Sequence, residues 1–411
     1  AFHMEMNQLY KNRDQEKIII TLYDKFFSTG FKSTTERLGI VFTPVEVVDF
    51  IVKSVDVVLR KHFGKTLASE NVHILDPFTG TGTFITRTLH YLKSLMDNDE
   101  ITFDDILRKY IQELHANEIV LLSYYIAAIN IEAVFDEING DEPYAPFEGI
   151  VLTDTFESTE TEDTLDDSFF GTNDKRLKRQ QEKPITAIIG NPPYSIGQNS
   201  QNDNNQNISY PRLDKRLAET YVSKSNAGLT KGLYDSYVKA FRWASDRLTN
   251  QGVIGFVTNG GYLNSNSTDG LRAGLYEDFN HLYIFNMRGN ALGLGEIRKK
   301  EGGNVFGAGT RTSVAISILV KDGSDNHELH YHDIGDYLSR KEKLAIISEF
   351  GDVSQLDWGK IIPDENNDWL NQRDPNYQKY DRLAGEDKVV FLQNIIGVST
   401  NRDSWVYGFS E

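Results

Sequence analysis

The chain has 411 residues, of which 39% are hydrophobic and 25% charged, proportions that are ordinary for a globular protein. It has no cysteine, which excludes a disulfide framework and a thiolate metal site. The formal net charge of −17 argues against a free-standing nucleic-acid binder, because such affinity rests largely on neutralised phosphates. No apolar run approaches membrane length and no signal peptide opens the sequence, so we expect a cytoplasmic protein without a membrane partner.

The first part of the chain predicts helices. Residues 6–31 have apolar side chains close to helical spacing, and we assign residues 1–38 to a helical lead-in. A second helix is predicted from Val45 through Leu59, with Thr43 as its N-cap and Pro44 at its first position.

An apolar strand then runs into Asp76-Pro77, followed by a Gly80-x-Gly82 turn and a helical pattern from Phe84. This order is typical of the first strand–turn–helix unit of a dinucleotide-type fold. The turn lacks the third glycine of the NAD pattern and the Gly-Lys-Ser/Thr of a nucleoside triphosphate site. An acid beside it would suit the cationic amino-acid end of S-adenosylmethionine, although a purely structural turn remains the alternative.

The next strand is expected at residues 111–114, followed by a helix over residues 119–130, and a further strand is expected from Gly149. An acid at the tip of such a strand can hydrogen-bond the ribose of an adenosyl ligand. Glu118 and Glu113 are the candidates, and His115 is interpreted as a loop residue. The strand from Gly149 ends in Asp154 and Phe156. Asp154 would accept a hydrogen bond from the adenine amino group of the donor, and Phe156 would pack against the adenine ring.

A fourth strand, from Ala187 to Ile189, stops at Asn191-Pro192-Pro193-Tyr194 because proline cannot continue a sheet ladder. The Asn191 carboxamide and the Pro192 carbonyl could each accept one hydrogen of an aromatic amine. Tyr194 could stack on a base taken out of its duplex. The competing interpretation is a plain turn, since Asn and Pro are common in turns for local reasons.

Farther along, residues 197–209 are rich in Asn, Gln and Ser and predict a mobile loop. A helix is expected over residues 234–248 and a buried strand over residues 253–258. Residues 281–285 and 312–320 predict a closing pair of strands, with a glycine-rich basic excursion between them that contains Phe306.

Taken together, Asp76-Pro-Phe-x-Gly-Thr-Gly-Thr-Phe84 and Asn191-Pro-Pro-Tyr194 resemble the γ-type DNA adenine-N6 methyltransferases. More narrowly, Gly39 to Val48, Asn117-Glu118 and Thr400 to Tyr407 are similar to the methyltransferase portion of the bacterial type ISP restriction-modification enzymes. The resemblance implies a class I S-adenosylmethionine-dependent methyltransferase fold, α/β and Rossmann-like, with a mainly parallel seven-stranded sheet. It implies donor binding by Thr43, Pro44, Asp76, Phe78, Gly80, Gly82, Thr83, Phe84, Glu118, Asp154 and Phe156, and catalysis by Asn191, Pro192, Tyr194 and Phe306.

The resemblance also implies direct methyl transfer, without a metal or a covalent enzyme intermediate, at a domain spanning residues 39–333. Residues 334–411 are expected to be a connector toward a target-recognition domain that this chain lacks and that would bind double-stranded DNA. Nuclease and helicase-like domains would belong to the same polypeptide. A methyltransferase acting on RNA or on a protein glutamine, and a non-catalytic coupling scaffold, are the alternatives.

Overall fold

The computed structural model describes residues 43–160, 171–193, 209–248, 250–307, 310–372, 376, 379–381 and 389–391. The chain divides into two compact units, one ending at Leu370 and the other beginning at Asn371. The helical lead-in predicted for residues 1–38 lies outside the described residues. None of the helices within the described ranges is long and apolar enough to cross a membrane.

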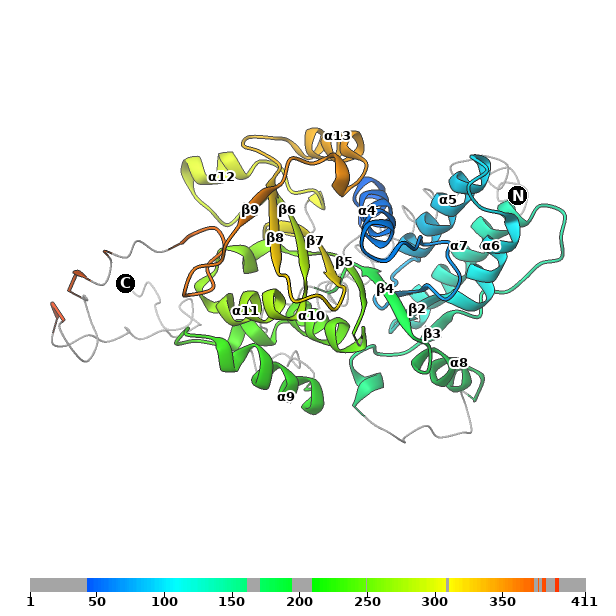
Figure 1. The fold of residues 1–411 in the computed structure, drawn as a ribbon, viewed down its shortest axis with the longest axis horizontal. Coiled ribbons are helices and arrows are strands. Elements are labelled where there is room, and N and C mark those ends of the chain that lie inside the picture. Colours follow the sequence, from blue (N-terminus) through cyan, green and yellow to red (C-terminus); the bar gives the residue numbers. More distant parts are fainter. Residues whose placement is uncertain are drawn as a thin grey trace, which may run out of the picture. The chain divides into compact units, whose positions relative to one another are not determined.

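The first unit is built on a nine-stranded sheet in the order β3-β2-β1-β4-β5-β7-β6-β8-β9, two more strands than the seven predicted (Figure 1). Strands β3, β2, β1, β4 and β5 are parallel, and β7 runs antiparallel between β5 and β6. Strand β8 is parallel to β6, and β9 is antiparallel to β8. The strand bounds are β1 His73–Asp76, β2 Leu114–Glu118, β3 Ile150–Leu152, β4 Ile185–Gly190, β5 Gly252–Asn259, β6 His281–Arg288, β7 Val314–Lys321, β8 Glu328–Asp333 and β9 Gly359–Ile361.

Helices cover both faces of this sheet, so the unit has three layers (Figure 1). Side chains alternate across β5: Val253 and Val257 face the core under α4, α5, α7 and α13, whereas Ile254 and Phe256 face the core under α9, α10 and α11. The helix bounds are α4 Val45–Phe63, α5 Thr83–Asp97, α6 Phe103–Arg108, α7 Leu121–Asn139, α8 Gly171–Gln181, α9 Pro211–Thr220, α10 Ser236–Arg247, α11 Asp269–Asp278, α12 Gly295–Glu301 and α13 Arg340–Phe350.

The second strand lies later in the chain than predicted, because polar contacts hold residues 109–113 in a π-helical turn. Lys109 donates to the carbonyls of Ser69 and Val72 and pairs with Glu113 at 2.7 Å. Glu113 therefore has a structural role at the amino end of β2. His115 lies within the strand, and its Nε2 is 3.0 Å from Nδ1 of His73, which corrects its assignment to a loop.

The predicted capping of α4 by Thr43 is also wrong. Pro44 is the N-cap residue, and no side chain caps this end of the helix. The backbone N–H groups of Val47 and Val48 use the Pro44 carbonyl instead. The Thr43 hydroxyl is therefore available for the contact described below.

Residues 334–370 pack on the sheet rather than forming a separate segment after residue 333. Helix α13 packs against α4, and β9 extends the sheet beyond β8. Trp369 is buried in the core on the α10 face. A connector of the kind predicted from residue 334 would therefore begin no earlier than Asn371.

Candidate active site at the carboxyl edge of the sheet

Four candidate polar residues lie at one edge of the sheet because the strands that carry them are parallel. Asp76 ends β1 and pairs in register with Ala116 of β2, and Glu118 ends β2. Asp154 follows β3, and Asn191 follows β4 directly. The carboxyl edge of an open α/β sheet is where such folds bind ligands.

The turn between β1 and α5 needs its two glycines. Gly80 and Gly82 have φ angles of 56° and 90°, the left-handed region that residues with a Cβ rarely adopt. A Cβ on Gly82 would also lie 3.3 Å from the backbone of Ala127 in α7. Thr83 then begins α5, while Phe84 is only 3% exposed and packs in the core. A donor contact from Phe84 stays a prediction.

Asp76 is a buried carboxyl with incomplete hydrogen bonding. Its Oδ1 accepts from the backbone N–H of Phe78 at 3.1 Å, but no donor among the described residues reaches its buried Oδ2. Burial raises the pKa of Asp76 to about 8, and the nearby charge of Glu118 adds to this effect. Such a group gains from a cationic or hydrogen-bond-donating ligand, because an unsatisfied buried acceptor is costly.

Glu118 ties the glycine turn to the second strand. One carboxylate oxygen accepts from Gly80 N and the other from Val120 N, both at 2.7 Å. Burial raises the pKa of Glu118 to about 7, although these backbone bonds favour the charged form. Each carboxylate oxygen has a second lone pair, so Glu118 can still accept from a ligand hydroxyl.

Asp154 and Phe156 form a cluster with Tyr210, a residue that sequence reasoning missed. Asp154 Oδ1 accepts from Phe156 N at 2.9 Å, and Oδ2 accepts from the Tyr210 hydroxyl at 2.8 Å. The Phe156 ring lies 5.5 Å from that of Phe78 and 5.3 Å from that of Tyr210. Pro211 at the start of α9 is the only signal near Tyr210 in the sequence, and it predicts a helix start rather than a site.

Asn191 is held by the residue that precedes α4. Its Nδ2 donates to Thr43 Oγ1 at 2.9 Å, so the predicted donor-binding residue Thr43 in fact contacts the predicted catalytic one. With the amide nitrogen facing Thr43, Oδ1 is the end that can accept from a target amine. Pro192 is buried beside Asn191, and Tyr194 lies outside the described residues.

Phe306 lies after α12 in the excursion between β6 and β7, the pair of strands predicted to close the sheet, and its side chain is 9% exposed. Asn304 fixes this segment by donating to the carbonyls of Gly289 and Thr312 and accepting from Phe306 N. The ring packs with the core on the α4 face. Its predicted contact with a target base stays a prediction.

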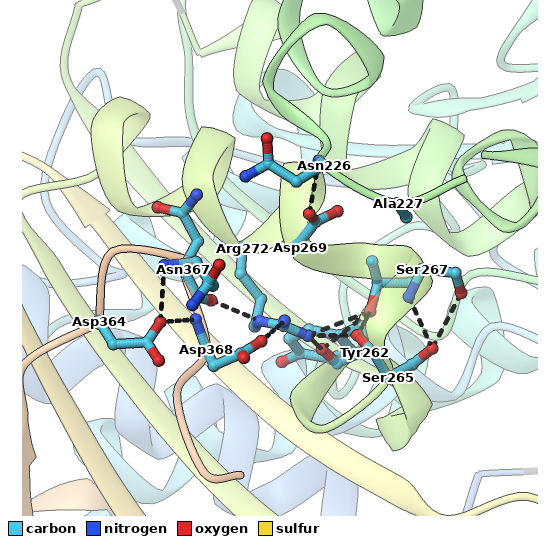
Figure 2. Close-up of polar contacts among 12 residues, drawn as sticks. Asn226, Ala227, Tyr262, Ser265, Ser267, Asp269, Arg272, Asp364, Asn367 and Asp368 are labelled. Carbon is cyan, nitrogen blue, oxygen red and sulfur yellow. Dashed lines mark hydrogen bonds and ion pairs between the residues drawn. The ribbon is translucent and has the colours of Figure 1, made fainter. Parts of the chain in front are cut away.

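The loop after β5 is held by Arg272 of α11 (Figure 2). Its guanidinium donates to the carbonyls of Tyr262 and Ser265 on one side and to the Asn367 carbonyl on the other. It also pairs with Asp368 at 2.6 Å. Arg272 is 1% exposed, so these bonds replace the water that the charge loses on folding.

The chain matches one protein-family model and is similar to several solved structures. The model of the family described as N-6 DNA methylase matches residues 14–278. The chain is similar to a nuclease-deletion mutant of the Type ISP restriction-modification enzyme LlaGI in complex with a DNA substrate mimic, with 66% identity and a TM-score of 0.90. It is also similar to the ATP-dependent Type ISP enzyme LlaBIII bound to DNA, with 54% identity and a TM-score of 0.90, and to DrdV in a DNA complex, with 38% identity and a TM-score of 0.85.

These structures are much longer than the chain. The match covers 96% of this chain but 32% of the LlaGI chain, 95% but 27% of the LlaBIII chain, and 95% but 38% of the DrdV chain. The comparison with curated proteins gave no match.

Replacing Arg272 with Ala should destabilise the protein by about 3–5 kcal/mol, because it removes a buried charge that pairs with the Asp368 carboxylate at 2.6 Å. The free energy of unfolding, measured with urea, tests this value. The exposed Arg298 is a matched control, and Arg298→Ala should change stability by less than about 0.5 kcal/mol. Equal stability of the two variants would contradict the assigned role of Arg272.

Proposed function

The chain belongs to the N-6 DNA methylase family, and we propose that it is the methyltransferase module of a type ISP restriction-modification enzyme. In this proposal it transfers a methyl group from S-adenosylmethionine to N6 of an adenine flipped out of duplex DNA. The observation that carries the proposal is the Asn191 carboxamide, oriented by Thr43 at the edge where Asp76, Glu118 and Asp154 also lie.

The chemistry of the three acids supports an adenosyl ligand with a cationic amino-acid end. The unsatisfied Oδ2 of Asp76 suits an ammonium group, and the remaining acceptor capacity of Glu118 suits ribose hydroxyls. Asp154 would accept from the adenine amino group, beside the rings of Phe156 and Phe78. When bound, S-adenosylmethionine supplies an electrophilic methyl group on a sulfonium centre.

The residues after β4 would prepare the target nitrogen. An exocyclic amine is a weak nucleophile because its lone pair is delocalised into the ring. Asn191 Oδ1 and the Pro192 carbonyl would accept its two hydrogens and favour the pyramidal nitrogen that attacks the methyl carbon. Tyr194 would hold the extruded base by stacking. The protein thus contributes position and hydrogen bonds rather than a covalent intermediate.

The proposal also includes the substrate, duplex DNA, and the further domains of the polypeptide. LlaGI and LlaBIII are described with a DNA substrate mimic and with DNA, and the match covers 32% and 27% of their respective chains. We infer that double-stranded DNA is the substrate and that recognition, nuclease and motor domains belong to the same polypeptide. Methyl transfer from labelled donor to DNA, RNA and protein acceptors tests the substrate class, and transfer to RNA or protein alone would contradict it.

Donor binding should depend on pH through Asp76. The free carboxyl has a raised pKa of about 8, so below pH 8 it must lose a proton to pair with the donor's ammonium. Affinity for S-adenosylhomocysteine should therefore rise between pH 6 and pH 8, by up to about tenfold per pH unit, with proton release at pH 7. Titration calorimetry in buffers of different ionisation enthalpy measures both quantities.

The control for this pH dependence is Asp76→Asn, which is neutral throughout. It should bind the donor more weakly and lose most of the slope between pH 7 and pH 8, where Glu118, with a pKa of about 7, is at least half ionised. A wild-type affinity that is constant from pH 6 to pH 8 would count against the placement of the ammonium at Asp76.

Replacing Asn191 with Ala should slow methylation at least about a hundredfold while donor affinity changes little, because the lost acceptor acts mainly as the amine becomes pyramidal. Single-turnover methylation and calorimetry on the polypeptide with all its domains separate the two effects. Asn326→Ala, at an exposed position on the other edge of the sheet, is the control. Near-normal turnover in Asn191→Ala would sink the mechanism.

Thr43 should act as a positioning residue for Asn191. Thr43→Val keeps the shape but removes the acceptor, and a hydrogen bond worth about 0.5–1.5 kcal/mol predicts a roughly two- to tenfold lower kcat. The KM for DNA should be unchanged, and Thr43→Ser should restore the rate. Equal rates for the valine and serine variants would show that the contact is only structural.

A further inference from the structure

A cluster of histidines and carboxylates lies at the other edge of the sheet, away from the candidate active site. His281 begins β6 and Glu328 begins β8, and these two residues pair in register. Asp322 follows the end of β7, which is antiparallel to β6. His62 lies in the last turn of α4. The cluster thus joins the amino ends of β6 and β8 and the carboxyl end of β7. It also includes the end of α4, which is far from these strands in sequence.

Three of these side chains direct nitrogen or oxygen atoms at one small space. Asp322 Oδ2 is 3.0 Å from His281 Nε2 and 3.7 Å from His62 Nδ1. The two imidazole rings have centroids 4.2 Å apart, and the three ligand atoms lie within 4.8 Å of one another. Ligands about 2.0–2.1 Å from a tetrahedral Zn²⁺ are themselves roughly 3.4 Å apart, which falls between the two distances to Asp322.

The outer nitrogen of each histidine faces a second partner, as in metal sites where such partners orient the ligands. His281 Nδ1 is 3.5 Å from Glu328 Oε2, and His62 Nε2 is 3.5 Å from the Tyr283 hydroxyl. The other oxygen of Asp322 accepts from the backbone N–H of Ser324 at 2.8 Å.

Hydrogen bonding alone does not account well for the cluster. The 3.7 Å separation of His62 Nδ1 and Asp322 Oδ2 is too long for a hydrogen bond. The buried His281 Nδ1 makes no hydrogen bond to any described residue.

We propose that His62, His281 and Asp322 bind a divalent first-row transition-metal ion of the Zn²⁺ class, with Glu328 as the carboxylate that orients His281. Two imidazoles and one carboxylate favour such an ion over Mg²⁺ or Ca²⁺, which prefer oxygen ligands. The ion would link the end of α4 to the β6–β7 pair and stabilise this junction. Its position at the amino edge keeps it apart from methyl transfer.

The test is zinc binding by tag-free, metal-stripped protein, measured by equilibrium dialysis with elemental analysis and by titration calorimetry. We expect one equivalent per chain and a rise in melting temperature on adding zinc. His62→Gln and Asp322→Asn should each weaken binding at least about tenfold and abolish the rise in melting temperature. Asp325→Asn removes an exposed carboxylate from the same turn and should behave as wild type.

Folding and the alternative ligand set are checked with the same samples. Circular dichroism and donor binding establish that each variant is folded. If Asp322→Asn does not fold, His62→Gln still tests the site, because it leaves β6 unchanged. No zinc binding by the wild type, or unchanged binding in both folded variants, would overturn the proposal. Loss of binding in His330→Gln but not in His62→Gln would also overturn it, by placing the ion on the Glu328 side of His281.

Discussion

The parallel pairing of β1 with β2 and β4 is the constraint on which the rest of the structure depends. It brings residues that are far apart in sequence, Asp76, Glu118 and Asn191, to one edge of the sheet. The same pairing brings two buried carboxyls close together, and burial together with the nearby charge of Glu118 raises the pKa of Asp76. Backbone N–H groups of the glycine turn donate one hydrogen bond each to the carboxyls of Asp76 and Glu118 and hold them in place. Both carboxyls can still accept further hydrogen bonds from a ligand.

Much of this edge could be predicted from the sequence, because its signals are local. β4 ends at Gly190, just before Asn191 and Pro192, and the glycines of the first turn adopt left-handed backbone angles, so both loops follow from residue type. The family assignment and the α/β fold are confirmed by the family match and by the similar structures. The roles of individual site residues stay predictions.

Other features could not be predicted because they depend on contacts between distant segments. Most of the strand expected at residues 111–114 belongs to a π-helical turn that ends at Glu113, since the buried Lys109 binds carbonyls some 40 residues earlier. Thr43 was assigned to a helix cap, whereas it contacts Asn191, which is separated from it by 148 positions. Helix α13 and strand β9 lie in the stretch from residue 334 whose charged composition resembles a connector, and only the packing of α13 on α4 and the pairing of β9 with β8 show that they belong to the first unit.

The contacts of Arg272 have a consequence for how the loop after β5 can change. Three of its partners, at Tyr262, Ser265 and Asn367, are main-chain carbonyls, which every residue type possesses. These hydrogen bonds therefore do not depend on the side chains at positions 265 and 367, although the left-handed φ of 58° at Asn367 favours Asn or Gly there. The loop after β5 is thus anchored through its backbone, so exposed side chains on it can change during evolution while the contacts of Arg272 are kept.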